Sequence, residues 1–265
     1  NNLGSILKNL GNLDDAILNF MKARDINPNS IDTHYNLGTA LIQQGEINSG
    51  ISSLKIALSI NSDYAEAHNN LGTAYKQLGL ISDSIKSYKK AISIKENYAE
   101  AHNNLGLLLM NLGDLESSCK HLKKALKINP DYIFANNNFG LYLSQIGKFS
   151  QSLDYFNKAI SLNPNFFEAY SNLGNALKYL KRHDESLACY EKSYAINPEA
   201  EYSLGSLVHS KLHLSMWSEI DEHIIEIRKK INANEKTIVP FPLLALIDDP
   251  ELHKKTAQIY IDDKF

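Results

Sequence analysis

One feature of this sequence constrains its fold more than any other: the triplet Asn-Leu-Gly returns at a period of 34 residues. Self-similarity at a fixed period in this range is the signature of a chain made of stacked copies of one small unit. A single copy cannot bury its own apolar surface, so neighbouring copies must pack on one another. The sequence therefore predicts an extended array rather than one globular core. The triplet begins at Asn2, Asn36, Asn70, Asn104 and Asn172, and Asn138 begins the near copy Asn-Phe-Gly.

Other positions repeat in step with the glycine, which we number as repeat position 8. Position 20 is small (Ala16, Gly50, Ser84, Ser118, Ser152, Ser186), position 24 is large (Phe20, Leu54, Tyr88, Leu122, Phe156, Tyr190), and position 27 is alanine (Ala23, Ala57, Ala91, Ala125, Ala159) or Ser193. Position 32 is proline in four units (Pro28, Pro130, Pro164, Pro198), with Ser62 and Glu96 as exceptions. This pattern resembles the tetratricopeptide repeat (TPR). The resemblance implies an all-α fold, a right-handed TPR superhelix or alpha-alpha solenoid with a helical C-terminal junction.

Elementary helix chemistry agrees with this pattern. Each unit contains two amphipathic stretches, an A helix and a B helix, separated by a turn that holds Gly11, Gly45, Gly79, Gly113 or Gly147. Glycine adopts the left-handed conformation that ends a helix. The glycine at position 8 and the small residue at position 20 allow the two helices to approach closely. We therefore expect the A helices to form the inner wall of the stack.

The regular pattern ends at Pro198, and three segments are expected. Residues 1–198 hold six TPR units, the first lacking its start, and residues 199–232 hold a degenerate seventh helix pair with an isoleucine stripe (Ile220, Ile224, Ile227 and Ile231). Residues 233–265 form a Pro-containing junction. In it, Asp249 and Pro250 predict the start of a last helix over 250–263 that buries Leu252, Ile259 and Tyr260.

The tail carries a second resemblance. The stretches 207–211, Met216-Trp217-Ser218 and 239–250 are similar to the junction that follows the TPR array in bacterial O-linked N-acetylglucosaminyltransferase-like proteins, although Met216 stands where an aspartate is usual. In that family two nucleotide-fold lobes follow the junction, and none occurs before Phe265. The resemblance implies that this chain is the acceptor-recruiting region of such a glycosyltransferase and has no catalytic activity of its own.

Repeat positions 2, 5, 6, 9, 12 and 13 share the face of the A helices that we expect to line the inner wall. Asparagines recur on this face at positions 5 and 6. We call them the asparagine ladder: Asn2, Asn36, Asn70, Asn104, Asn138 and Asn172 at position 6, with Asn69, Asn103 and Asn137 at position 5. An amide can both donate to and accept from a peptide backbone, whatever the peptide's side chains are. The resemblance to O-GlcNAc transferases implies the same peptide-holding role. The alternative interpretation is that these amides only cap or hydrogen-bond within the A helices.

Position 2 adds acidic residues (Asp32, Glu66, Glu100 and Glu168) and one aromatic residue, Phe134. The inner wall is therefore expected to be polar and mildly acidic. It lacks the lysine or arginine clamp with which chaperone-binding TPRs hold a C-terminal carboxylate.

Several other functions are not favoured by the sequence. The net charge of -3 gives no reason to expect nucleic acid or an anionic membrane as a partner. No apolar run reaches the roughly 18 residues of a membrane span. His34, His68 and His102 recur one helix spacing apart, too far for one ion, so we expect them to pack structurally. His209 and His213 have the i, i+4 spacing of a metal pair on one helix, but no third ligand is obvious, so we expect them to be structural as well. No catalytic motif, metal site or cofactor site is present.

Two cysteines, Cys119 and Cys189, lie far apart in the sequence and are expected to be core residues of a reduced, cytoplasmic protein. Three hypotheses for the whole chain follow. The first is the acceptor-recruiting region of a glycosyltransferase, which holds a protein or an extended peptide. The alternative is a free-standing TPR adaptor that assembles protein complexes. In the third hypothesis, the main role of the array is to form a homodimer.

Overall fold

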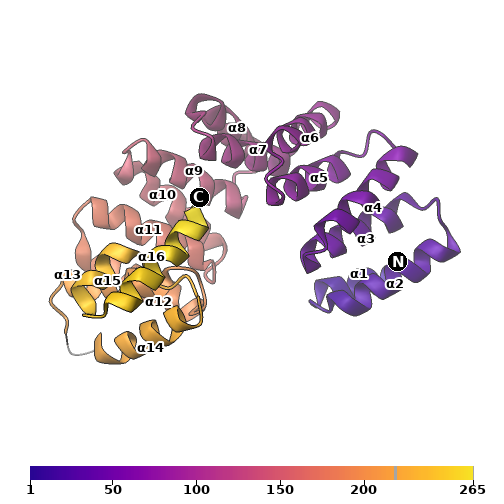
Figure 1. Ribbon diagram of the computed structural model, residues 1–265. Coiled ribbons are helices and arrows are strands. Elements are labelled where there is room, and N and C mark those ends of the chain that lie inside the picture. The colour runs from indigo at the N-terminus through magenta and orange to yellow at the C-terminus, as the bar shows by residue number, and fades with distance from the viewer. Residues whose placement is uncertain (218–219, 265) are drawn as a thin grey trace. The chain divides into compact units, whose positions relative to one another are not determined.

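The computed structural model describes residues 1–217 and 220–264, which form sixteen α-helices and no strand (Figure 1). Ser218, part of the predicted junction motif, and Phe265 lie outside these residues. The all-α TPR solenoid predicted from the repeat is confirmed. The chain divides into two compact units, Asn1–Pro130 and Asp131–Phe265, and each is described separately.

Unit 1 consists of four helix pairs, in each of which an A helix packs on the B helix that follows it. The pairs are α1 (Asn2–Asn9) with α2 (Leu13–Ile26), α3 (Ile31–Gln44) with α4 (Ile47–Ile60), α5 (Ala65–Gln77) with α6 (Ile81–Ile94), and α7 (Ala99–Asn111) with α8 (Leu115–Ile128).

Unit 2 contains two further regular pairs and then four helices that depart from the repeat. The regular pairs are α9 (Ile133–Gln145) with α10 (Phe149–Leu162) and α11 (Phe167–Tyr179) with α12 (His183–Ile196). The remaining helices are α13 (Ser203–His213), α14 (Ile220–Asn232), α15 (Pro240–Leu246) and α16 (Pro250–Lys264).

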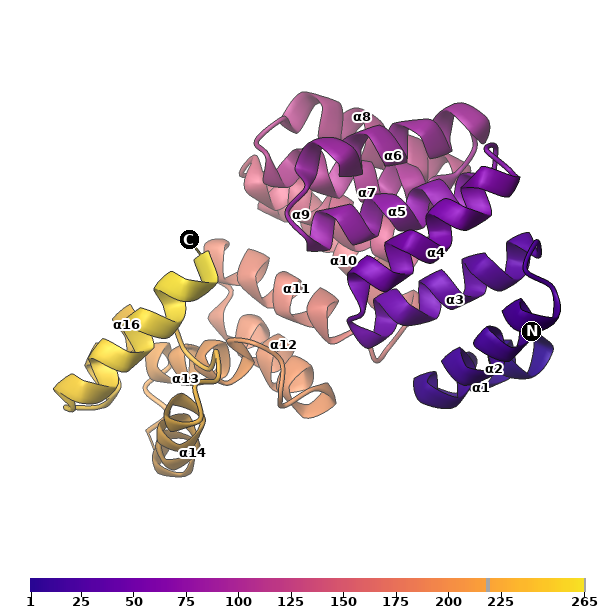
Figure 2. The same ribbon diagram turned by 45° about the vertical axis from the view of Figure 1, so that its right-hand side comes forward.

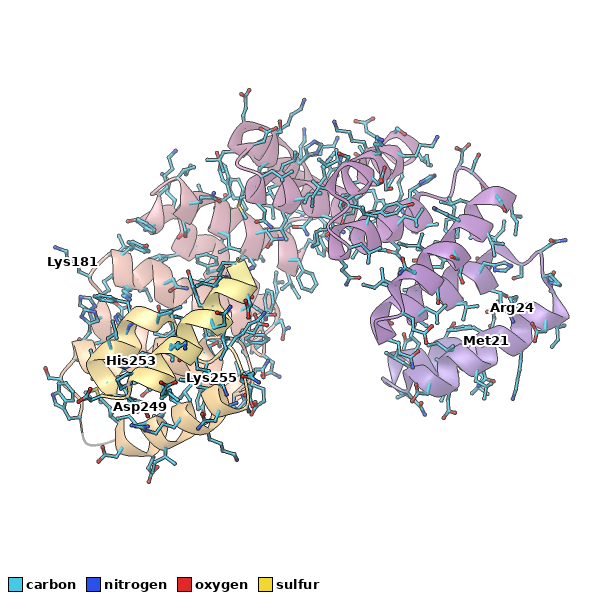
Figure 3. The ribbon with its side chains drawn as sticks, viewed as in Figure 1. Met21, Arg24, Lys181, Asp249, His253 and Lys255 are labelled. Atoms are coloured by element: carbon cyan, nitrogen blue, oxygen red, sulfur yellow. The ribbon has the colours of Figure 1, made fainter. Side chains whose placement is uncertain are left out.

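The turn between the A and B helices uses a left-handed residue, as the sequence predicts. The five turn glycines have φ values between 71° (Gly79) and 94° (Gly45). In the sixth unit the same place is taken by Lys181, with φ 59° (labelled in Figure 3). A side chain in this conformation costs about 1 kcal/mol or more, so the sixth turn is strained where the other five are not.

The predicted close approach at position 8 is present, but the large residue at position 24 defines it as much as the small one at position 20. A Cβ on Gly72 would lie 2.6 Å from the ring of Tyr88, which is fully buried. Ser84 at position 20 donates from Oγ to the Gly72 carbonyl at 2.7 Å. The glycine therefore makes room for an aromatic ring, while the serine satisfies the backbone behind it.

The four irregular helices of unit 2 share one core. Ile220, Ile227 and Ile231 are buried and Ile224 is partly buried, which matches the predicted stripe, and they pack with residues from all of α13–α16. Figure 2 shows α16 in yellow, and it contacts both α14 and α15. In α16, Leu252 is buried, whereas Ile259 and Tyr260 are half-buried.

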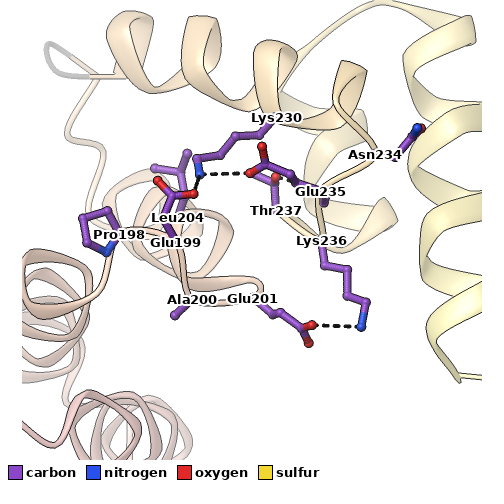
Figure 4. Close-up of a pocket in the computed structure, with 10 residues that line it drawn as sticks. All are labelled: Pro198, Glu199, Ala200, Glu201, Leu204, Lys230, Asn234, Glu235, Lys236 and Thr237. Carbon is purple, nitrogen blue, oxygen red and sulfur yellow. Dashed lines mark hydrogen bonds and ion pairs between the residues drawn. The ribbon is translucent and has the colours of Figure 1, made fainter. Parts of the chain in front are cut away.

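Polar contacts fasten the segment 233–239 to the start of α13. Tyr202 and Gly205 donate their backbone N–H groups to the carbonyls of Lys236 and Thr237. Figure 4 shows Lys230 between Glu199 and Glu235, and Lys236 paired with Glu201, around a cavity of about 280 Å³. The junction is therefore an integral part of unit 2.

The predicted start of the last helix is confirmed. Asp249 Oδ1 accepts from the Leu252 N–H at 3.1 Å, and Lys255 donates from Nζ to the Asn232 carbonyl at the end of α14 (Figure 3). An aspartate cap of this kind contributes about 1 kcal/mol. These contacts fix α16 against α14.

Candidate peptide-binding surface

The A helices of each unit form its inner wall. Within unit 1, α3 contacts α5 and α5 contacts α7, and within unit 2, α9 contacts α11. Among the described residues, no two successive B helices of the regular pairs contact each other as extensively. The asparagine ladder lies where the A helices meet.

In unit 1 the ladder residues bond across successive A helices. Asn104 donates from Nδ2 to Asn69 Oδ1 at 3.1 Å, and Asn69 in turn donates to Glu100 Oε1 at 2.9 Å. Asn70 donates to Thr39 Oγ1 at 3.1 Å and to Tyr35 Oη at 3.3 Å. Asn70 and Asn104 are thus tied to the preceding A helix.

Unit 2 repeats this arrangement. Asn172 donates from Nδ2 to Asn137 Oδ1 at 2.9 Å, and Asn137 donates to Asn138 Oδ1 at 3.5 Å. The bonds therefore run from one A helix to the next as well as within one A helix.

Burial separates the ladder into two classes. The position-5 residues Asn69, Asn103 and Asn137 are buried, with Asn69 only 1% exposed. At position 6, Asn36, Asn70, Asn104 and Asn172 are half-buried, Asn138 is buried, and Asn2 is exposed. In this structure the buried residues expose little surface to a peptide, whereas the half-buried ones expose more.

The half-buried amides keep hydrogen-bonding capacity. An asparagine amide has two N–H donors and an oxygen with two lone pairs. Asn104 uses one bond from Nδ2, and its oxygen accepts from Asn103 at 3.3 Å. Capacity for one donated and one accepted bond remains at Asn104. Whether peptides use it is not tested by these contacts, so the peptide-binding role of the ladder stays a prediction.

A cavity of about 280 Å³ opens beside Asn70. Its other polar lining residues are Thr39, Gln43, Thr73, Gln77 and Glu100. A lining of amides and hydroxyls with one carboxylate suits a ligand group that donates hydrogen bonds. Among the predicted ladder residues, Asn70 thus adjoins a hollow of side-chain size.

The acidic residues of the wall are partly compensated. Glu66 accepts from Lys95 Nζ at 2.8 Å. Although partial burial alone would raise its pKa, the bond and charge of Lys95 hold the pKa of Glu66 below its usual value. The mild acidity predicted for the wall of unit 1 is therefore carried by Asp32 and Glu100 more than by Glu66.

The recurring histidines have a structural role that sequence reasoning described only as packing. The Nε2 atoms of His34, His68 and His102 bond to the carbonyls of Pro28, Ser62 and Glu96, at 2.7, 3.0 and 3.1 Å. His253 makes the same bond to Ile247 at the start of α16. In each case the ring reaches back six residues and fastens the loop that enters the helix. The constant spacing from the helix start was the signal for this role.

His102 also contacts His121, with 2.9 Å between their Nδ1 atoms. Since His102 donates from Nε2 to a carbonyl, its Nδ1 is unprotonated and accepts from the Nδ1–H of His121. Burial and then the charge of His102 lower the pKa of His121 to about 4, and burial lowers the pKa of His102. Both rings are neutral at neutral pH.

Among residues 1–217 and 220–264, no cluster of three or more potential metal-ligating side chains was found. In the same residues, no helix combines the length and the apolar character needed to cross a membrane. Cys119 and Cys189 are free and half-buried, and burial raises the pKa of Cys189 to about 11.

Family models match most of the chain. One described as TPR repeat matches residues 4–45, 38–79 and 76–113, and two described as Tetratricopeptide repeat match 97–165 and 167–200. The protein is thus a helical-repeat scaffold in class, and the chain belongs to the TPR family. No curated protein matches the sequence.

Solved TPR structures share the fold. PilF of Pseudomonas aeruginosa is 20% identical with a TM-score of 0.67, and the match covers 75% of this chain and 90% of that one. YrrB, a TPR protein with an unusual peptide-binding site, is 22% identical with a TM-score of 0.50, over 68% and 92%. A chain of the APC/C hetero-tetramer Cut9–Hcn1 is 14% identical with a TM-score of 0.76, over 97% and 48%.

At these identities the likeness establishes the fold alone. Neither the family models nor these structures link residues 200–265 to a glycosyltransferase.

Proposed function

We propose that this chain is a non-catalytic scaffold that holds an extended peptide segment of a partner protein along the inner wall of unit 1. The observation that carries the proposal is the pair of half-buried position-6 amides Asn70 and Asn104, which are fixed by bonds to the preceding A helix and keep spare hydrogen-bonding capacity. Solved TPR structures whose names record a peptide-binding site or a protein complex support it.

The spacing of these amides suits an extended chain. Packed helices lie about 8–10 Å apart, and an extended peptide rises about 3.3 Å per residue. One ladder amide would therefore meet about every third peptide residue. Amides that are already oriented lose little freedom on binding, which favours affinity. The cavity beside Asn70 would receive a side chain that donates hydrogen bonds, such as lysine or arginine.

An arrayed library of extended peptides, read by fluorescence polarisation, tests this function. For the best binder, the double change Asn70→Ala and Asn104→Ala removes two backbone contacts of about 1 kcal/mol each, so we expect about a tenfold or greater loss of affinity. Asn48→Ala, on the exposed outer side of α4, is the matched control and should change nothing. Equal binding by the double variant would refute the ladder, provided its helical circular dichroism is intact.

A second candidate function is the acceptor-recruiting region of a bacterial O-GlcNAc-transferase-like enzyme. The tail resemblance motivates it, and the structure adds that Phe241 and Leu244 of α15 are 83% and 58% exposed. Large exposed apolar residues on a structured junction suit contact with another domain. The coding sequence downstream of Phe265 decides the matter: a nucleotide-sugar-binding domain is required, and without one the free-standing adaptor is the better proposal.

A further inference from the structure

A cavity of about 140 Å³ in unit 2 is lined by polar side chains that include an ammonium. It lies where α11 and α13 meet the junction, and its polar lining residues are Asn175, Lys178, Tyr190, Tyr202, Ser206 and His209. Asn175 and Ser206 occupy repeat position 9, and Lys178 and His209 occupy position 12. The cavity therefore belongs to the inner wall of unit 2, but it uses none of the ladder residues.

The half-buried Lys178 lacks an acidic partner among the described residues. Its Nζ lies 3.1 Å from Nδ1 of His209, and burial lowers its pKa. Other lysines of unit 2 in similar surroundings are paired: Lys230 with Glu199 and Glu235, and Lys236 with Glu201 and Asp263. A partly desolvated ammonium without an acidic partner gains a charge-assisted hydrogen bond when an anion enters the cavity, so Lys178 is a place where an anion can bind.

The state of His209 follows from its contacts. Burial, then the charge of Lys178 and the proximity of His213, lower the pKa of His209 to about 4. The ring is neutral at neutral pH, and its Nδ1 accepts from the lysine ammonium. The single proton of a neutral imidazole is then on Nε2, which is a donor. The ring of His213 packs edge-on against His209 at 4.7 Å and stacks on His183 at 5.7 Å.

The three hydroxyl groups of the lining donate their protons to other residues, and Ser206 donates to the Tyr202 carbonyl at 2.9 Å. Tyr190 donates its hydroxyl to Asn175 Oδ1 at 2.8 Å, which leaves the Asn175 Nδ2 group as a donor. Tyr202 donates its hydroxyl to Asp263, whose charge is balanced by Lys236 and Lys264. No carboxylate is among the described residues that line the cavity. The described lining residues thus offer an ammonium, an amide N–H and an imidazole N–H as donors and include no carboxylate.

We propose that this cavity binds an oxyanion carried by a protein partner, with Lys178 as the cationic ligand and Asn175 and His209 as hydrogen-bond donors. Carboxylate and phosphate groups share the required chemistry: negative charge and oxygen acceptors without donors. The cavity volume admits either group. The site differs in position and composition from the asparagine ladder, so each can be removed without the other.

Nuclear magnetic resonance of the histidine ring nitrogens, followed with acetate and with inorganic phosphate at constant ionic strength, tests the site on the whole chain. We expect saturable shifts of His209 and of the Asn175 side-chain amide. We also expect the pKa of His209 to rise by about one unit, because an adjacent anion favours the imidazolium. Saturation by acetate identifies acidic side chains as the ligand, and saturation by phosphate alone identifies phosphorylated ones.

Three variants make the result decisive. Lys178→Met should weaken binding of the anion at least tenfold and abolish the rise in the pKa of His209, and Lys178→Arg should restore much of both. Lys76→Met changes the lysine at the same repeat position of α5 and should have no effect. The proposal is overturned if neither anion shifts His209 saturably, or if Lys178→Met binds as the unchanged protein does while its circular dichroism is native.

Discussion

The two units of this molecule contain the same kind of helix pair but bury their apolar residues in different ways. In unit 1 four pairs repeat with little variation, and each buries its own large residue at position 24 between neighbours. In unit 2 two such pairs are followed by α13–α16, which pool their apolar residues in a single core. A stack of repeats needs a terminal element with a closed core, because its last pair has no further neighbour. The irregular tail supplies that closure.

The inner walls differ as well. The cavity in the wall of unit 1 is lined by amides, hydroxyls and Glu100, whereas the cavity in the wall of unit 2 is lined by Lys178 beside a neutral histidine and, among its described residues, by no carboxylate. The same repeat can thus form cavities that favour ligands of opposite charge, because the residues at inner-wall positions differ between repeats while those at packing positions are similar. Four predictions follow from the comparison.

The largest effect is expected from opening the pooled core of unit 2. Ile227→Ala removes a fully buried side chain and should cost about 3 kcal/mol of unfolding free energy. Because α13–α16 share this core, hydrogen exchange should accelerate in all four helices together. Leu122→Ala, which is equally buried in unit 1, should cost a similar amount but accelerate exchange mainly in α7 and α8. If hydrogen exchange accelerated over equally many helices in both variants, the result would contradict the difference between the units.

A smaller effect is expected from the ladder, which both units share. Asn69→Ala deprives Asn104 and Glu100 of a buried partner and should cost about 2 kcal/mol, measured by denaturant unfolding. Asn137→Ala should behave alike in unit 2, where Asn172 loses its acceptor. Asn36→Ala, at a half-buried ladder position, is the control and should lie within about 0.5 kcal/mol of the unchanged protein. A neutral Asn69→Ala would mean that the ladder does not hold the helices together.

Acid should weaken the α7–α8 pair. The pKa of His121 is about 4 in the folded protein and about 6.5 when unfolded. Between these values the unfolded chain binds more protons, so stability falls as the pH falls from 6.5 towards 4. With a discount for the half-exposed ring, we expect a loss on the order of 1 kcal/mol from this residue. His121→Gln should flatten that part of the stability–pH curve, measured by urea unfolding at several pH values, and an unchanged curve would show that the His102–His121 contact has no such role.

The smallest effect tests the sixth turn. Lys181→Gly replaces a side chain at φ 59° and should raise stability by about 0.5–1 kcal/mol. The reverse change in the preceding turn, Gly147→Lys, should lower it by about the same amount. Thermal unfolding measures both. A destabilising Lys181→Gly would show that the entropy of the unfolded glycine exceeds the relief of strain.

Much of the fold could be predicted from the sequence. The period located the helix pairs, the turn glycines located the left-handed residues, and Asp249 located the start of α16. The left-handed conformation of Lys181 could not be predicted, because nothing in its residue type indicates such a turn. The histidines at position 4 recur at a constant distance from the helix start, but that spacing only hints at their bond to the carbonyl six residues earlier, because the bond also depends on the path of the loop.

The asparagine ladder shows most clearly which features the sequence determines and which features the tertiary structure determines. The sequence by itself determined that asparagines recur on one face of the A helices, because a helix fixes which positions share a face. Only the tertiary structure decided that Asn69, Asn103 and Asn137 are buried while their neighbours stay within reach of solvent. It also decided that Lys178 has a histidine and not a carboxylate beside it. The physical reason is that these partners lie 31–35 residues apart. A hydrogen bond tolerates only a few tenths of an ångström, so the packing distance between successive helices determines whether it forms.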